Sequence, residues 1–257
     1  MLYKLRKWID PRSLNKRMLT TNPCAIELLE KYEDIEWFYL SSNSAAVHML
    51  QYIQSHITWS MLSQNSSAIH LLKDNLDRID WFWLSTMPEA IHIIEANPEC
   101  IVWSQLSRNS AAIHLLEANP DKIAWKFLSS NPAAIKMLES NPEKINWEYL
   151  SRNPAAIHLL KAKPDRIDWV VLSLNPAAID MLEANQHRIH WGQLSQNPSA
   201  IHLLEQNQDK IDYYLFSKNP AIFTYDYDRM SMPFTEELMA NRFHPRNLEK
   251  FESWGYE

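Results

Sequence analysis

Histidines recur at one place in a repeating pattern, an arrangement that suggests metal binding or pH sensing. They are spaced by 22 residues or a multiple of 22: His48, His70, His92, His114, His158 and His202. Lys136 and Asp180 fill the two gaps in this series. Stacked helices lie ~8–10 Å apart, too far for neighbouring imidazoles to share one zinc ion at bonds of ~2 Å. The column therefore predicts a solvated face with local pairs three residues apart, such as His114 with Glu117, and no metal site.

Tryptophans form a second and stricter column. Each lies 22 residues after the last, at Trp37, Trp59, Trp81, Trp103, Trp125, Trp147, Trp169 and Trp191, and Tyr213 takes the ninth place. A fixed period of this length is typical of tandem-repeat proteins. Exposed tryptophans in such a stack can serve as platforms for nucleic-acid bases, but most units carry acidic residues beside Lys or Arg, as in Asp121-Lys122. The column instead predicts a structural core of buried spacers between units.

Asn-Pro supplies the turn that begins the first helix of each unit. In the unit from Ile145 to Arg166, Asn153 precedes Pro154. A residue before proline favours the extended backbone that an N-cap needs, Asn is a good N-cap side chain, and proline fits the first helical position. We therefore expect a helix from Pro154 to about Ala162.

A second, shorter helix carries the tryptophan. Asp168 precedes Trp169 and is the expected N-cap, while Ile167 and Leu172 form a hydrophobic staple across it. This helix is expected to run from Trp169 to Ser173. A helix this short is marginal in water, so packing between units must hold it.

These units predict an all-α solenoid, a superhelix of about nine 22-residue two-helix repeats. We expect an open, right-handed superhelix roughly 70–90 Å long at helix-packing distances, with a cap at each end. The boundaries are an N-terminal cap at 1–20, the repeats at 21–219 and a C-terminal cap or tail at 220–257, which includes a helical stretch from Phe234 to Ala240. A leucine-rich repeat is the alternative, but it needs an apolar column five residues before the Asn, where Ser60, Lys126 and Glu148 stand.

Composition narrows the function classes. Apolar residues make up 46% of the 257 residues, enough for a continuous core, and the net charge of -6 disfavours a general nucleic-acid binder. The sequence shows no long apolar run for a membrane helix or signal peptide. Cys24 and Cys100 occupy non-equivalent places in the repeat, which favours reduced thiols in a cytosolic compartment. No nucleophile–base set, phosphate-binding loop or metal cluster appears, so we expect neither an enzyme nor a cofactor.

Variable columns are the predicted recognition surface. On the tryptophan helix, Trp, Leu and Ser share one side, whereas the places one, two and five residues after Trp lie opposite. The residues one and five places after Trp differ in chemical type from unit to unit. Several of them are aromatic or Arg, which are typical binding anchors. Drift on an unconstrained face is the alternative explanation. The predicted partner-binding residues are Phe38, Phe82, Arg108, Lys126, Glu148, Arg152, Val170 and Tyr214.

The repeat consensus, Asn-Pro-x-Ala-Ile-x-Leu-Leu-Glu followed by Ile-x-Trp-x-x-Leu-Ser, resembles short tandem repeats of large nucleocytoplasmic DNA viruses that infect protists. It is clearest from Ser107 to Trp169, and the tail from Glu236 to Gly255 is similar to terminal segments of such proteins. The resemblance implies a virus-encoded chain in host cytoplasm or virion. We expect a non-enzymatic protein–protein interaction scaffold for a host or viral protein. A self-associating virion component is the alternative, and nucleic-acid binding is a third.

Overall fold

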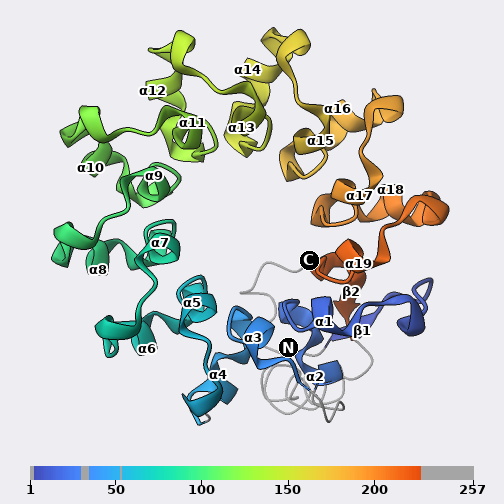
Figure 1. The fold of residues 1–257 in the computed structure, drawn as a ribbon. Coiled ribbons are helices and arrows are strands. Elements are labelled where there is room, and N and C mark those ends of the chain that lie inside the picture. The colour runs from blue at the N-terminus through green and yellow to red at the C-terminus, as the bar shows by residue number, and fades with distance from the viewer. Residues whose placement is uncertain (1–2, 30–34, 53, 227–257) are drawn as a thin grey trace, which may run out of the picture.

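The computed structural model describes residues 3–29, 35–52 and 54–226. Short helices alternate between an inner and an outer circle around a ring (Figure 1). The predicted all-α solenoid class is therefore confirmed. In the described ranges the strands are limited to β1 (Tyr3–Leu5) and β2 (Phe223–Tyr225), which pair with each other, so no unit contributes the strand of a leucine-rich repeat.

The inner circle consists of ten described helices of the tryptophan type. They are α1 (Lys16–Leu19), α3 (Trp37–Leu40), α5 (Trp59–Leu62), α7 (Trp81–Leu84), α9 (Trp103–Leu106), α11 (Trp125–Leu128), α13 (Trp147–Ser151), α15 (Trp169–Leu172), α17 (Trp191–Leu194) and α19 (Tyr213–Phe216). The outer circle consists of α2 (Ile26–Leu29), α4 (Val47–Leu50), α6 (Ile69–Lys73), α8 (Ile91–Ala96), α10 (Ile113–Ala118), α12 (Ile135–Glu139), α14 (Ile157–Ala162), α16 (Ile179–Glu183) and α18 (Ile201–Gln206).

Local capping follows the sequence prediction closely. Asn153 has φ -76° and ψ 113°, and its side chain accepts a hydrogen bond from the Ala155 N–H. A 3-10 turn, Pro154–Ala156, then leads into α14, which ends at Ala162. Asp168 caps α15 by accepting from the Val171 N–H. The sequence prediction missed one element, a 3-10 turn such as Pro164–Arg166 that connects an outer helix to the next inner one from α4 onward.

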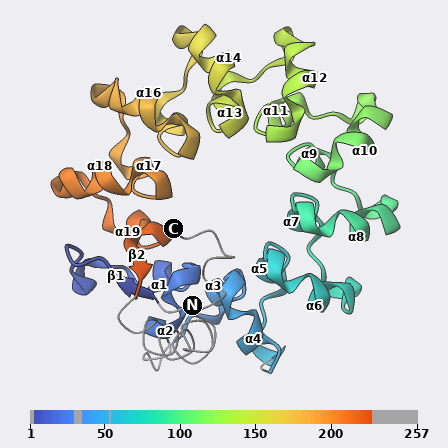
Figure 2. The same ribbon diagram turned by 180° about the vertical axis from the view of Figure 1, so that it is seen from behind.

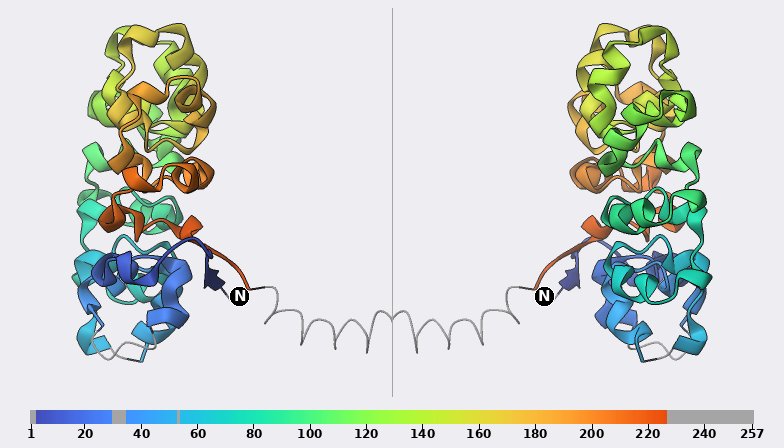
Figure 3. Two further views of the ribbon diagram at one scale, coloured as in Figure 1. Left: turned by 90° about the vertical axis from the view of Figure 1, so that its right-hand side faces the viewer. Right: turned by 90° about the vertical axis from the view of Figure 1, so that its left-hand side faces the viewer.

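The solenoid closes on itself, which corrects the expectation of an open superhelix 70–90 Å long with separate caps. The segments at the two ends of the described chain lie side by side from front and back (Figures 1 and 2), and the edge-on views show one ring and no rising coil (Figure 3). The Asn22 amide donates to the carbonyls of Ser217 (3.1 Å) and Asn219 (3.0 Å), and the Asn15 N–H donates to Ser217 Oγ. These bonds are the same ones that join consecutive units elsewhere. Residues 15–29 therefore act as a tenth unit.

A two-stranded sheet covers this seam. β1 and β2 run antiparallel with Tyr3 opposite Tyr225, and the Arg6 N–H donates to the Ile222 carbonyl. In the last unit the 3-10 turn Pro220–Ile222 continues into β2 in place of an outer helix. The tail from 227 to 257, including the predicted helix from Phe234 to Ala240, lies outside the described residues.

A lattice of buried Asn and Ser side chains joins neighbouring units. The Asn153 amide donates to the carbonyls of Ser129 (3.1 Å) and Asn131 (2.9 Å) in the preceding unit. Ser151 Oγ donates to the Trp147 carbonyl within its own unit and accepts from the Asp168 N–H of the next unit. Buried backbone groups need such partners, because an unpaired one costs about 1–3 kcal/mol. The lattice thus satisfies the carbonyls between helices too short to satisfy them alone.

The hydrophobic core follows the wall of the ring between the two circles of helices. Most inner helices bury the Leu three residues after Trp, with Phe216 at that place in the last one. The buried residues of the outer part of a unit are the Ala of the 3-10 turn and the second Leu of the helix, as at Ala156 and Leu160, with Ile94 in place of Leu in α8. The tryptophans themselves are half-buried and pack against this core. Among the described residues, no helix has the length and apolar character needed to cross a membrane.

Replacing a lattice Asn is expected to destabilise the ring strongly. Asn153→Ala removes two amide donors and one cap acceptor from a buried site, so we expect a loss of about 3–4 kcal/mol in the free energy of unfolding. Asn141→Ala is the matched control, because the Asn141 amide makes one local bond to the Met137 carbonyl in a half-buried site. It should cost about 1 kcal/mol or less. Urea denaturation followed by circular dichroism measures both, and equal losses would contradict the role of the lattice.

Cys24 provides a test of ring closure. It lies beside Tyr3 of β1 at the seam, and burial raises the pKa of its thiol, partly offset by a hydrogen bond with Tyr3. Because the thiolate is the reactive form, Cys24 should be alkylated slowly at neutral pH in the closed ring. A variant with Asn22→Ala and Ser217→Ala weakens the seam, and its Cys24 should react faster.

Cys100, far from the seam, is the internal reference in the same alkylation experiment. Its rate should not change when the seam is weakened. Peptide mass spectrometry over a time course separates the two cysteines. An unchanged Cys24 rate in a folded seam variant would show that these bonds do not hold the ring closed.

Candidate functional site

The inner circle of helices presents a continuous surface to the middle of the ring, which we call the inner wall. Each inner helix buries its Leu and Ser toward the outer helices, so at 100° per residue the positions one, two and five after Trp turn the other way. Ten helices spaced ~9–10 Å apart on a circle place opposite axes about 30 Å apart. Since a helix with side chains is about 10–12 Å across, the opening is roughly 20 Å wide.

The position directly after Trp is exposed in most units. Phe38, Phe82, Val170 and Tyr214 are between 44% and 50% exposed. Lys126 and Glu148 occupy the same position in two other units and are also exposed. The predicted recognition residues of this column therefore lie on accessible surface. They are distributed around the ring and do not form one patch.

The structure brings four of the predicted residues together. Arg108, Lys126, Glu148 and Arg152 follow one another on the inner wall from α9 to α13. Arg108, Glu148 and Arg152 line a single groove of about 470 Å³ together with Ser130, Tyr149, Pro154 and Val171.

Two aromatic residues that the sequence prediction left out organise this groove. The Arg108 guanidinium lies 4.5 Å from the ring centre of Phe127 and 5.3 Å from that of Tyr149. The Lys126 ammonium lies 5.1 Å from the Tyr149 ring centre, and the two rings meet edge to face at 5.5 Å. Both aromatics stand two residues after Trp, in a column that is mostly apolar. One pattern in the sequence could have identified these two aromatic residues as part of a site: Arg and Lys occupy the neighbouring inner-wall positions.

The inner wall differs in charge from the chain as a whole. Its three columns hold one acidic side chain, Glu148, whereas the full chain carries a net charge of -6. The basic side chains of these columns are Arg17, Arg108, Lys126, Arg152 and Lys218. Three of the five lie around the groove, and the other two lie on either side of the seam.

The tryptophan column belongs to the wall itself. Each ring packs one side on the core, and in several units a cation from the 3-10 turn that ends the same unit covers it. Lys144, for example, lies 4.3 Å from the Trp125 ring centre and Lys210 lies 4.4 Å from that of Trp191. The sequence predicted buried spacers, but the tryptophans are half-buried, because the fully buried places between units belong to Leu, Ser and Asn. Their covered faces leave little room for base stacking.

Histidines lie on the outer helices and connect neighbouring units. His114 Nε2 lies 2.7 Å from Glu95 Oε1, and His158 and His202 pair in the same way with a Glu 19 residues earlier. The expected pair of His114 with Glu117 in the same helix is wrong, because the preceding unit presents its Glu directly beside the imidazole. In the described part of the chain, no group of three or more His, Cys, Asp or Glu side chains is placed to hold a metal ion.

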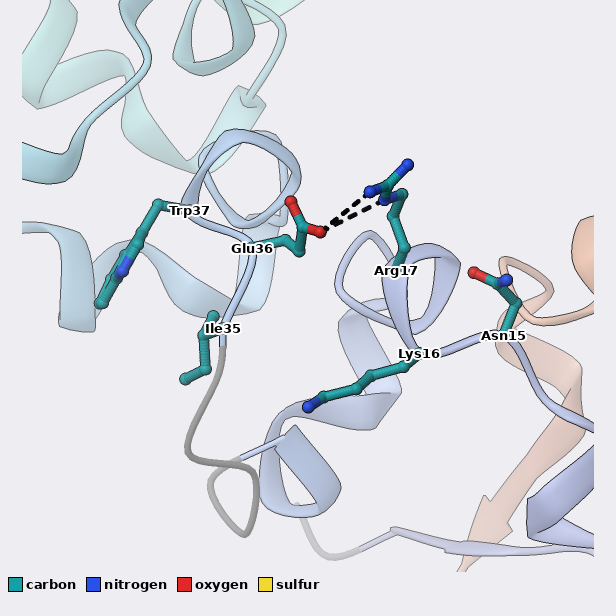
Figure 4. Close-up of a pocket in the computed structure, with 6 residues that line it drawn as sticks. All are labelled: Asn15, Lys16, Arg17, Ile35, Glu36 and Trp37. Carbon is teal, nitrogen blue, oxygen red and sulfur yellow. Dashed lines mark hydrogen bonds and ion pairs between the residues drawn. The ribbon is translucent and has the colours of Figure 1, made fainter.

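A second hollow, of about 590 Å³, lies between α1 and α3 (Figure 4). Lys16 stands there at the position of the missing tryptophan of the first unit. Arg17 Nη2 lies 3.2 Å from Glu36 Oε1, and Arg17 and Trp37 point away from each other. Arg17, the one inner-wall cation that lines this hollow, is thus already paired with the Glu36 carboxylate.

Comparisons with protein families, with curated proteins and with solved structures give no match to this chain. The resemblance to viral tandem repeats accordingly stays a prediction.

Substitutions in two neighbouring columns should separate structural from recognition residues. Trp125→Ala removes a large ring from the core and from Lys144, so we expect a loss of about 2–4 kcal/mol in the free energy of unfolding. Phe82→Ala removes a side chain that is 44% exposed on the inner wall, and we expect a loss of about 1 kcal/mol or less. Thermal and urea unfolding of the two variants measure the difference. A large loss for Phe82→Ala would place that column in the core.

Proposed function

We propose that the ring is a non-enzymatic protein–protein interaction scaffold that holds a segment of a partner protein against its inner wall. One observation carries the proposal: the inner-wall position after Trp is exposed and differs from unit to unit, whereas Leu, Ser and Asn recur beside it. If the fold required specific residues at that position, the units would resemble one another there. Selection for binding accounts for large aromatic side chains at an exposed site.

The shape of the ring supports the same proposal. An opening of roughly 20 Å accommodates an extended segment or one helix of about 10–12 Å. A concave surface built from repeats is a frequent binding surface in solenoid proteins. Aromatic and Arg side chains, which are enriched at binding hot spots, face this opening from Phe38, Phe82, Arg108, Arg152 and Tyr214.

The alternative is a virion component that self-associates through an end or an edge, and the ring weakens its end-to-end form. Both terminal units use their repeat surfaces on each other at the seam, so neither surface is free for another copy. The resemblance of the repeats to those of large DNA viruses supports a virus-encoded chain with a host or viral partner.

Affinity capture tests the proposal. The bait is the full chain, incubated with a lysate of the cells that naturally contain it. In the test variant Phe38, Phe82, Arg108, Arg152 and Tyr214 are all alanine. In a matched control the outer residues His48, His92, His114, His158 and His202 are alanine. We expect that a protein is captured by the wild-type chain and by the control variant but not by the test variant.

Circular dichroism and size-exclusion chromatography establish first that all three proteins keep their helices and their size. If the test variant captures the same proteins as the control variant, the residues of the inner wall differ from unit to unit because of drift and not because of binding. Assembly of the wild-type chain alone with rising concentration, without any partner, would favour the self-associating component.

A further inference from the structure

The groove between α9 and α15 holds guanidinium groups without a carboxylate partner. Arg108, Ser130 and Arg152 occupy the same position in three successive units, five residues after Trp, and Val171 and Pro154 also line the groove. Neither Arg108 nor Arg152 takes part in an ion pair within the described chain, although 31 acidic residues are present in the sequence.

Arg108 is held in place by stacking. Its guanidinium lies against the rings of Phe127 and Tyr149, which fixes the plane of the group. Its Nε is covered and has no acceptor in the structure. A planar, oriented guanidinium is well suited to bind a carboxylate by donating two parallel hydrogen bonds to it. Because the stacking already restricts the side chain, less conformational entropy is lost on binding.

The other lining residues define the rest of a ligand. Arg152 is exposed and adds a second positive charge at the groove. Glu148 gives one negative charge there, Tyr149 gives a phenol, and Ser130 Oγ is engaged with the Phe127 carbonyl. Val171 and Pro154 provide an apolar end. The groove thus offers an excess of positive charge next to an apolar surface, with one acceptor available for a backbone N–H.

From this geometry we infer that the groove binds an acidic peptide segment. An Asp or Glu carboxylate of the partner lies between Arg108 and Arg152, and an aliphatic side chain beside it packs on Val171 and Pro154. Glu148 accepts a hydrogen bond from the peptide backbone. The inference rests on the proposed function, and it names the chemistry of the partner at this part of the inner wall.

Single-stranded nucleic acid fits the groove less well. Base stacking needs free aromatic faces, whereas cations already cover Phe127 and Tyr149. A phosphate backbone needs a continuous basic track, whereas the basic residues of the inner wall are confined to the groove and the seam. Glu148 repels phosphate inside the groove itself.

Fluorescence anisotropy on the full chain tests the inference. The probe is a short labelled peptide that alternates Glu and Leu, and the matched probe has Gln in place of Glu. We expect the Glu peptide to bind about tenfold more tightly or better, because charge-assisted bonds are about twice as strong as neutral ones. Arg108→Met and Arg152→Met should each weaken the Glu peptide by about tenfold or more.

Two further variants make the result specific. Lys218→Met removes an inner-wall cation outside the groove and should leave binding unchanged. Arg108→Lys keeps the charge but loses the planar fork, so affinity should fall even though net charge is preserved. Equal affinity for the Glu and Gln peptides, or an equal loss with Lys218→Met, would overturn the inference. So would tighter binding of oligothymidylate that displaces the peptide and weakens steeply with salt.

Affinity capture with a groove variant separates failure of this inference from failure of the proposed function. A folded variant with Arg108→Met and Arg152→Met should lose the partner, or lose most of it. If this variant keeps the partner while the five-residue inner-wall variant loses it, the scaffold function stands and the acidic-segment inference fails.

Discussion

A buried side-chain amide is the interaction on which the ring depends. In nearly every unit an Asn caps its own helix with its oxygen and donates both amide hydrogens to carbonyls of the preceding unit, as Asn153 does to Ser129 and Asn131. Helices of four to six residues leave most of their carbonyls without partners inside the helix. The amide pairs the two carbonyls that follow an inner helix of the preceding unit and, by its geometry, fixes how each unit sits on the last. Met87 takes this place in one unit and cannot donate, which marks one junction as different from the others.

Closure follows from that fixed geometry. Curvature of a solenoid arises from a small rotation per repeat, and ten equal steps of about 36° complete a circle. The seam repeats the regular contact, with Asn22 reaching Ser217 and Asn219. A ring also removes the need for polar caps, because each end covers the apolar face of the other. The β1–β2 pair then fastens the closed ring from outside the repeat pattern.

The ring separates structural from variable residues by position. Leu, Ser and Asn recur inside the wall, His and Glu pair units along the outer helices, and the inner wall carries the side chains that differ. Burial constrains the first group, because a change there leaves a cavity or an unpaired polar group. The exposed positions of the inner wall have no such constraint, so their aromatic rings and basic groups are free to serve recognition. The groove at Arg108 and Arg152 shows how neighbouring units combine into one site.

Four features can be predicted from the amino-acid sequence alone: the period, the helix starts at Asn-Pro, the capping Asp168, and the exposed column that contains Phe38, Phe82 and Tyr214. These are local properties, set by backbone preferences and side-chain periodicity within one unit. Other features become visible only when the units are packed together: the closure of the solenoid, the half-buried tryptophans, the pair of His114 with Glu95, and the stacking of Arg108 on Phe127 and Tyr149. Those features depend on the angle between units. A few degrees per step decide between an open coil and a ring, and such an angle comes from packing across units and leaves no local pattern in the chain.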